Sequence, residues 1–295
     1  MQIREWRLKR RTFPIGERTL LMGVLNITPD SFSDGGQFYS PEQAQARARE
    51  LIAEGADIID IGGESTRPGA GAEPVTAEEE MRRVIPIVEY LTSETEVAVS
   101  VDTTKAEVAG TALRAGADII NDISALRFDF HIADEVAKAE AGLVLMHSRG
   151  TPATMHRLPP VPDIFEEVAR SLRSSISMAE RRGVSRDAIV IDPGIGFGKS
   201  LEQNVELIAR LDNLARRLPE FPILIGTSRK SFIGRLLEDA PVSERLYGTL
   251  ATVTAAILKG AHIIRVHDVR AARETIIVAD AIKRAALGDQ ADREA

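Results

Sequence analysis

The chain has 295 residues, of which 44% are hydrophobic, enough to bury a large core in one large domain or two ordinary ones. Its formal net charge of −7 provides no general basic field and disfavours nucleic-acid binding, and the absence of cysteine excludes disulfides and thiolate chemistry. No apolar run approaches the roughly 18 residues that a membrane span needs, and the basic segment Met1–Arg11 lacks the apolar core of a signal peptide. We therefore expect a soluble, cytoplasmic protein with neither a nucleic-acid nor a membrane partner.

The first residues, Ile3–Arg18, alternate in short stretches around a break at Pro14–Gly16, which predicts a hairpin-like cap over residues 1–19. After this cap, short apolar runs that are typical of buried strands alternate with segments of helical periodicity. The predicted strands are Thr19–Leu25, Asp57–Ile61, Val97–Val101, Asp118–Ile123, Leu143–Met146, Ile189–Ile191, Ile223–Ile225 and His262–Val266.

Capping patterns predict where several of the intervening helices begin. In each, a Ser or Thr stands three residues before a Glu or Gln, so that side chain and backbone can satisfy each other. These stretches are Ser40–Gln43, Thr76–Glu79, Thr104–Glu107 and Ser200–Gln203. A weaker helical stretch spans roughly His131 to Ala141, and a stronger one begins near Asp163. The last predicted helix ends at about Leu287, which leaves residues 289–295 as a predicted disordered tail.

Three strand–helix units repeat a Gly-Ala-x-Ile-Ile phrase, which begins at Gly55, Gly116 and Gly260. In each unit a helix-ending glycine precedes an apolar strand whose last residues are polar. Strands that alternate with helices pair in parallel, and a closed (β/α)8 TIM barrel over residues 20–288 accounts for all of them. A doubly wound open sheet is the alternative, but no Gly-x-Gly-x-x-Gly string follows the first strand.

Polar side chains stand at the ends of nearly all the predicted strands, and in a barrel these ends meet at one mouth. They are Asn26, Asp60, Asp102, Asn121, Asp122, His147, Asp192, Ser228, Lys230, Arg265, His267 and Asp268. Any one of these Asp residues could be a helix cap or an ion-pair partner, but so many coincident ends favour a binding site. Because a buried carboxylate must be paired or hydrogen-bonded, Asp102 predicts a cation or a polar ligand nearby.

The stretch Ile223–Ser231 is the strongest candidate for an anion site. Its apolar strand breaks at Gly226 and is followed by two hydroxyl residues and two cations, just before a helical pattern begins. Free backbone N–H groups and the dipole at a helix start favour an anion, and Lys230 adds a mobile ammonium. The alternative interpretation is a solvated Arg–Lys pair at a helix start.

Two connections, Ile27–Tyr39 and Gly62–Val75, are longer than ordinary strand–helix links and rich in glycine. Loops of this kind on an active face usually serve as lids or binding loops, although plain surface flexibility is the alternative. The side chains that favour a clasp around an aromatic acid are Phe32, Thr66, Arg67 and Pro68.

A series of strings, in order along the chain, closely resembles the dihydropteroate synthase family of pterin-binding TIM barrels. The strings are Asn26–Gly36, Gly62–Gly69, Ser100–Thr103, Asn121–Ser124, Asp192–Lys199, Gly226–Ser231 and Arg265–Val269. The match runs from about Leu20 to Ile282, and the first, second and sixth strings are the most specific. Two departures are small: Ala125 stands where the family commonly has Gly, and Met146–Gly150 is one of several variants.

The resemblance implies the condensation of 6-hydroxymethyl-7,8-dihydropterin diphosphate with p-aminobenzoate, a step of folate biosynthesis. The products would be 7,8-dihydropteroate and pyrophosphate, formed by a dissociative displacement in which Mg²⁺ assists the departure of pyrophosphate. No covalent enzyme nucleophile is implied. The resemblance also implies a homodimer and competition between sulfonamides and p-aminobenzoate.

The resemblance carries roles over to individual residues. The catalytic residues would be Asp102, Lys230, Arg265 and His267. The pterin-binding residues would be Asp102, Asn121, Met146, Asp192, Phe197, Gly226 and Lys230. The diphosphate would be held by Asn26, Thr66, Arg265 and His267, with Asn26 also a ligand of Mg²⁺. The p-aminobenzoate would lie against Phe32, Thr66, Arg67, Pro68, Phe197 and Ser231.

Three other classes of protein share part of this pattern. The pterin-binding barrel of a folate–corrinoid methyltransferase has the pterin carboxylates but does not need the Thr28–Gly36 string or the Ser228–Lys230 turn. A catalytically silent pterin-binding homologue would keep the same side chains, and only an assay of turnover separates it. An unrelated phosphate-binding barrel enzyme is disfavoured by the two long motif loops.

Overall fold

The structure of the protein is a computed structural model that describes residues 4–27, 41–64, 75–151 and 153–294. Within these residues, eight strands form one parallel sheet in the order β8-β7-β6-β5-β4-β3-β10-β9. A parallel bridge between Ile191 and Ile223 joins the two ends of this sheet, which therefore closes into a barrel. The strands are β3 (Leu20–Asn26), β4 (Ile58–Gly62), β5 (Ala98–Asp102), β6 (Ile119–Asp122), β7 (Gly142–Met146), β8 (Ile189–Asp192), β9 (Leu224–Ile225) and β10 (Ile263–Val266). The predicted (β/α)8 barrel is thus confirmed.

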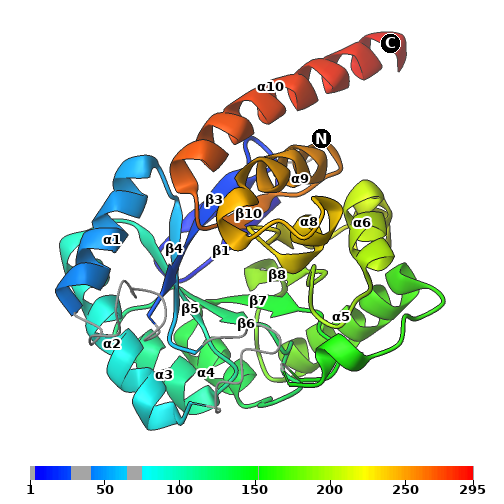
Figure 1. Cartoon of the computed structure of the whole chain (residues 1–295). Coiled ribbons are helices and arrows are strands. Elements are labelled where there is room, and N and C mark those ends of the chain that lie inside the picture. Colours follow the sequence, from blue (N-terminus) through cyan, green and yellow to red (C-terminus); the bar gives the residue numbers. More distant parts are fainter. Residues whose placement is uncertain (1–3, 28–40, 65–74, 152, 295) are drawn as a thin grey trace.

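Helices surround the strands and cover the outside of the barrel (Figure 1). They are α1 (Pro41–Glu54), α2 (Ala77–Glu94), α3 (Ala106–Arg114), α4 (Ile132–Ala139), α5 (Ile164–Arg181), α6 (Leu201–Ala209), α7 (Leu211–Arg217), α8 (Ser231–Leu236), α9 (Leu246–Leu258) and α10 (Val269–Glu294). Helix α5 shows why these segments pack where they do. Its residues Ile164, Val168, Leu172 and Ile176 are spaced four apart and all are buried in the main hydrophobic core.

Two of the predicted capping boxes have the expected side-chain contact, and one does not. The Ser200 hydroxyl accepts the backbone N–H of Gln203, and the Thr76 hydroxyl accepts that of Glu79. The prediction for Thr104 is wrong, because α3 begins after Lys105 and no side chain of the cap residue bonds its first turn. Instead, Asp129, which lies in the connection between β6 and α4, accepts the backbone N–H of Ala106 with its carboxylate at 2.8 Å. Ser40 lies outside the described residues.

An antiparallel hairpin of β1 (Arg4–Arg7) and β2 (Thr12–Ile15) confirms the predicted hairpin-like cap. Trp6 is fully buried and packs with apolar residues near the beginning of the barrel strands, and its indole N–H donates to the Ala188 carbonyl at 2.9 Å. The hairpin therefore closes the N-terminal end of the barrel. The polar residues that end the strands, such as Asp102, Asn121 and Asp192, lie at the other end of the barrel.

The chain closes on itself where β3 pairs with β10. At the start of β3, the backbone N–H and hydroxyl of Thr19 both donate to the Asp280 carboxylate of α10, at 2.8 and 2.7 Å. Helix α10 then continues through Glu294, so residues 289–294, which we predicted to be a disordered tail, are helical here. The C-terminal half of α10 projects beyond the barrel (Figure 1). None of the helices among the described residues has the length and apolarity that crossing a membrane would demand.

The turn after β6 has a left-handed backbone at Ala125 and Leu126, with φ of 50° and 65°. This conformation costs a residue with a side chain roughly 1–2 kcal/mol relative to the right-handed form. The buried Asp122 holds the turn, since its carboxylate accepts the N–H groups of Ser124 and Leu126 at 2.7 and 2.6 Å. Glycine adopts this left-handed conformation without that cost, so Ala125 is a strained residue at this position.

Candidate active site

The mouth of the barrel collects the polar residues that end the strands. The register of the sheet sets Asp102 of β5 beside Asn121 of β6, and Met146 of β7 beside Asp192 of β8. Asn26, which ends β3, is paired with Gly62 of β4, and Gly62 is paired in turn with Asp102 of β5. The parallel pairing therefore brings together residues that are widely separated in sequence.

Arg265 of β10 is held between two carboxylates of the mouth. Its Nε lies 2.6 Å from Asp60 Oδ2, and one of its terminal nitrogens lies 2.9 Å from Asp102 Oδ2. Asp60 is completely buried and also accepts the Ser100 hydroxyl at 2.6 Å and the Asn121 side-chain amide at 3.0 Å. The sequence placed Asp60 only among the polar strand ends, and its function as the buried counter-ion of Arg265 was missed.

The charges at the mouth do not balance, because one guanidinium faces two carboxylates. The pKa of Asp102 is raised to about 7, chiefly by burial and also by the charge of Asp60, against the attraction of Arg265. Burial acts to lower the pKa of Arg265, but the two carboxylates outweigh it and leave that pKa above its ordinary value. The site thus holds an excess of negative charge that a proton or a cationic ligand can satisfy.

Two further charged groups, Asp192 and Lys230, lie at the same mouth. Burial raises the pKa of Asp192, an effect that the nearby Lys230 opposes. Burial likewise lowers the pKa of Lys230 to about 8. The Lys230 ammonium donates to the Ile195 carbonyl at 2.5 Å and lies 4.6 Å from the centroid of the Phe197 ring. The structure thus brings together the three residues Asp192, Phe197 and Lys230, which were predicted to bind one substrate.

The loop after β8 has a constrained course that glycine makes possible. Gly194 has a φ of 67°, and a Cβ atom there would lie 1.9 Å from the His147 carbonyl oxygen. Lys199 fixes the loop from within, since its ammonium donates to the carbonyls of Gly194 and Phe197 at 2.8 and 3.1 Å. Its function was missed, and the available signal was its position as the cation that ends the Asp192–Lys199 string.

The predicted anion turn, Gly226–Ser231, presents one of its two cations to the mouth. Arg229, with a φ of 55°, pairs through two nitrogens with the Asp268 carboxylate at 2.8 and 2.6 Å. Its backbone N–H donates to the Thr249 hydroxyl at 2.9 Å. Arg229 therefore holds the turn in place, and Lys230 is the cation directed at the substrate side.

A short chain of polar contacts connects this turn to the first strand of the barrel. The Ser228 hydroxyl lies 2.9 Å from His267 Nδ1 and accepts the backbone N–H of His267 at 3.2 Å. The other ring nitrogen of His267 lies 3.4 Å from the side-chain amide of Asn26. Two residues predicted to hold the diphosphate, Asn26 and His267, are therefore adjacent.

The remaining predicted site residues fall into two groups. Met146 is buried at the end of β7, Gly226 follows β9 beside the Arg265 stem, and Ser231 is the exposed first residue of α8. The other residues lie outside the described residues, so their assigned roles stay predictions of the sequence. They are Phe32, Thr66, Arg67 and Pro68.

Asn26 is the residue at the mouth that the sequence predicts as a ligand of Mg²⁺. Among the described residues, no three His, Asp or Glu side chains gather as a metal-binding group. Near the diphosphate residues, the side-chain oxygen of Asn26 lies 3.4 Å from where a Cβ atom of Gly62 would stand. Mg²⁺ commonly keeps several waters and is bound through few protein ligands plus substrate phosphates. Asn26 fits an ion of that kind, which would arrive with the diphosphate.

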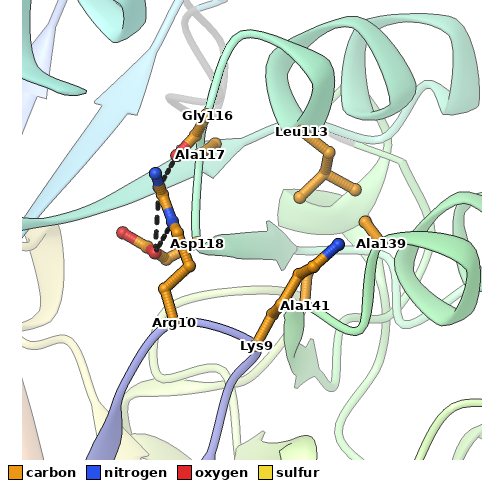
Figure 2. Close-up of a pocket in the computed structure, with 8 residues that line it drawn as sticks. All are labelled: Lys9, Arg10, Leu113, Gly116, Ala117, Asp118, Ala139 and Ala141. Atoms are coloured by element: carbon orange, nitrogen blue, oxygen red, sulfur yellow. Dashed lines mark hydrogen bonds and ion pairs between the residues drawn. The ribbon is translucent and has the colours of Figure 1, made fainter. Parts of the chain in front are cut away.

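A separate cavity of about 210 Å³ lies at the hairpin end of the barrel (Figure 2). Arg10 pairs there with Asp118 and donates to the carbonyl of Gly116. The remaining residues that line this cavity are Lys9, Leu113, Ala117, Ala139 and Ala141. The strand-end carboxylates described above are not part of its lining, so this cavity is distinct from the candidate active site.

Comparisons with known proteins agree with this geometry. The family model described as pterin binding enzyme matches residues 22–267. A dihydropteroate synthase of Synechocystis sp. is 48% identical over 272 residues, which cover 92% of this chain and 93% of that protein.

Solved structures of two dihydropteroate synthases resemble the whole barrel. The enzyme of Yersinia pestis, in complex with a sulfonamide drug, has a TM-score of 0.88 and 39% identity, covering 95% of this chain and 99% of that one. The enzyme of Xanthomonas albilineans, with 4-aminobenzoic acid, has a TM-score of 0.87 and 42% identity, covering 96% and 99%. Since the family model and these relatives span most of the sequence, the chain belongs to the dihydropteroate synthase family of pterin-binding enzymes.

Proposed function

We propose that the protein condenses 6-hydroxymethyl-7,8-dihydropterin diphosphate with p-aminobenzoate to give 7,8-dihydropteroate and pyrophosphate. The relatives named above are dihydropteroate synthases, and one of them was solved with 4-aminobenzoic acid. The single observation that carries the proposal is the shared mouth of the barrel. There, the carboxylates of Asp60 and Asp102 pair with Arg265, and the buried Asp192 and Lys230 lie close enough to influence each other and Arg265 electrostatically.

In this proposal the pterin ring occupies the space between these charged groups. Its ring N–H and amino groups are donors that match the carboxylates of Asp102 and Asp192 and the side-chain oxygen of Asn121. Its ring oxygen is an acceptor that matches the ammonium of Lys230. Because these groups are buried, an unmatched ligand would leave polar atoms unpaired, so the pattern of donors and acceptors selects the ring.

The diphosphate would lie near Arg265, His267 and Asn26. Arg265 uses two of its nitrogens for carboxylates, so the rest of its planar fork can donate to a phosphate oxygen. Mg²⁺, held by Asn26 and the diphosphate, would supply charge neutralisation of the leaving group. As the C–O bond lengthens, positive charge develops on the pterin methylene, and the carboxylate of Asp102 stabilises that charge. The arylamine nitrogen of p-aminobenzoate then forms a bond to the methylene carbon and loses one proton, while pyrophosphate leaves with the electron pair of the broken C–O bond.

The experiment that tests the function is pyrophosphate release by the purified protein. We expect release only when both substrates and Mg²⁺ are present, with 7,8-dihydropteroate formed in equal amount. A silent pterin-binding homologue would bind the pterin diphosphate without releasing pyrophosphate. A corrinoid methyltransferase domain would release none either, and it would bind a methylated folate instead.

Asp192→Ala should weaken binding of the pterin diphosphate. The substitution removes a charged acceptor, and one such hydrogen bond contributes roughly 1.5–3 kcal/mol. Isothermal titration calorimetry with the pterin diphosphate alone measures the change directly. Affinity equal to that of the wild type would exclude Asp192 from the pterin site.

Arg67→Ala should raise the Michaelis constant for p-aminobenzoate and leave pterin binding close to normal. The residue lies outside the described residues, and the prediction rests on its place in the Gly62–Gly69 string. Steady-state kinetics with each substrate varied in turn separates the two effects. Equal damage toward both substrates would show that this segment supports the whole mouth rather than the second substrate.

We also propose that the protein forms a homodimer. Several large apolar side chains on the last two helices are more than half exposed: Tyr247 of α9 and Ile277 and Val278 of α10. A second copy of the chain that covered this surface would remove them from water. The expected cytoplasmic location stays a prediction of the sequence.

A further inference from the structure

Lys199 is bonded entirely to the backbone of two neighbouring strand ends. Its ammonium donates to the carbonyls of Gly194 at 2.8 Å and Phe197 at 3.1 Å, both in the loop after β8. It also donates to the carbonyl of His147, which follows β7, at 3.3 Å. An ammonium has three N–H donors, so these three contacts use its whole capacity. Lys199 therefore ties the loop after β8 to the end of β7.

The loop needs such restraints because every second residue in it is glycine. Gly194, Gly196 and Gly198 all have a positive φ, of 67°, 86° and 71°. Glycine loses more conformational freedom on folding than any other residue, so this backbone does not hold one course by itself. Asn204 of α6, only 3% exposed, supplies a second restraint, since its side-chain oxygen accepts the N–H of Gly196 at 2.6 Å. Its amide group donates in turn to the Ser200 carbonyl at 2.7 Å.

The restrained loop contacts the residues that are predicted to bind the pterin. The N–H of Gly194 donates to Asp192 Oδ1 at 2.6 Å and so orients this carboxylate. The ring of Phe197 lies with its centroid 4.6 Å from the Lys230 ammonium. The same ammonium donates to the Ile195 carbonyl at 2.5 Å. A shift of the loop would therefore displace the pterin-binding groups at the mouth.

Charge couples Lys199 to the same carboxylate. Burial acts to lower the pKa of Lys199, and the charge of Asp192 opposes this effect. Burial raises the pKa of Asp192, and the charge of Lys230, the N–H of Gly194 and the charge of Lys199 oppose it. Burial also lowers the pKa of His147 to about 2, so that the imidazole beside Lys199 is neutral at pH 7. Lys199 thus supports an ionised Asp192 through the loop and through its own charge.

We propose that Lys199, together with Asn204, is a positioning residue for the pterin substrate. The two side chains hold the glycine-rich loop so that the carboxylate of Asp192 and the ring of Phe197 meet the pterin. The proposal rests on the proposed function, because it needs the same first substrate. A purely structural role would change the stability of the protein without any coupling to Asp192 in pterin binding.

Three variants release the loop in different ways. Lys199→Met keeps the aliphatic stem and removes all three N–H donors. Lys199→Gln keeps two N–H donors without a charge, so it separates hydrogen bonding from charge. Asn204→Ala removes the acceptor of the Gly196 N–H and leaves Lys199 in place, so it should fold even if Lys199→Met does not. Lys138→Met, at an exposed lysine of α4, is the matched control.

The measurement is isothermal titration calorimetry with the pterin diphosphate alone, after circular dichroism has shown that each variant is folded. Lys199→Met and Asn204→Ala should each weaken binding by about tenfold, the lower end of what one charged hydrogen bond contributes, because they loosen the acceptor without removing it. Lys199→Gln should recover part of this loss, and Lys138→Met should bind as the wild type does. In an Asp192→Ala background, Lys199→Met should cost much less than tenfold, since residues that act through one contact are not additive.

The outcomes separate this proposal from the function on which it rests. A wild type that binds the pterin diphosphate but releases no pyrophosphate would overturn the condensation alone, and a tenfold loss in the variants would still support the positioning role. Wild-type affinity in a folded Lys199→Met protein would overturn the positioning role alone. If that variant does not fold, wild-type affinity in Asn204→Ala would do so. An undiminished effect of Lys199→Met in the Asp192→Ala background would also overturn it, and a wild type that binds no pterin diphosphate would overturn both proposals.

Discussion

Lys230→Met should give a folded protein whose turnover falls by about a hundredfold to a thousandfold, the loss typical for removal of one preorganised electrostatic contact. The stem of Lys230 passes close to Gly196, and its ammonium lies 4.6 Å from the Phe197 ring centroid. Methionine can keep most of this packing, but it cannot donate to the pterin oxygen. Lys230→Arg should also be poor, because a planar fork does not replace a compact ammonium.

Stability should not explain this loss. The pKa of Lys230 is lowered to about 8 in the folded protein, so the folded state disfavours its charge relative to the unfolded chain. The destabilisation by the charged Lys230 has its full size below about pH 8 and disappears as pH rises toward the ordinary pKa of lysine. Lys230→Met should therefore be at least as stable as wild type at pH 7, as thermal unfolding followed by circular dichroism will show. A folded variant with full activity would remove Lys230 from the site.

Asp102→Asn should lower kcat/KM for the pterin diphosphate by a similar factor while it raises stability. The amide still forms hydrogen bonds, but it cannot stabilise positive charge on the pterin methylene. In the wild type, the pKa of about 7 means that kcat/KM should rise as pH increases through 7 and Asp102 ionises. The variant should lack this limb in its pH profile. A wild-type profile that is flat across pH 7, or a variant that retains the limb, would contradict the assignment.

The stability change of Asp102→Asn has a definite sign. The pKa of Asp102 is raised in the folded protein above its unfolded value of 3.8. The favourable contribution of Asp102 to the free energy of unfolding is therefore complete below about pH 4 and is lost as pH rises through about 7. The gain from the neutral amide should therefore be largest at pH 7 and above, and small at pH 4. Thermal unfolding of wild type and variant across this range measures the difference, and a gain confined to acid pH would contradict it.

Local patterns in the sequence were sufficient for the barrel, because a buried parallel strand is a short apolar run that can be recognised from its own residues. The polar residue that follows each apolar run can be recognised in the same way, so the site at the mouth of the barrel was predicted too. Pairing across the mouth could not be predicted in this way. Arg265 and Asp60 are 205 residues apart, and Arg229, one of the two cations of the predicted anion turn, pairs with Asp268. A sequence pattern identifies a polar strand end but not the partner that the fold gives it.

The start of α3 shows a second limit. A capping box is a local pattern, and Thr104 satisfied it. The first turn of α3 is instead capped by the carboxylate of Asp129, from the connection between β6 and α4. Lys199 was overlooked for a related reason. It bonds carbonyl groups from two segments that meet only in the folded barrel. The long-loop residues Phe32 and Thr66–Pro68 remain sequence predictions.

The pairing of the first barrel strand, β3, with the last, β10, has a consequence for the order of folding. Thr19 and Asp280, which fasten the first strand to the last helix, are separated by 261 residues. During synthesis, β3 leaves the ribosome before the other strands of the barrel and keeps one edge without its partner until β10 has been made. Trp6 must also wait, because the apolar cluster that buries it includes Leu20 of β3 and Ile263 of β10. The first residues to be translated therefore gain their last contacts only after the whole barrel has been made. Contacts between residues so far apart in the sequence favour slow folding.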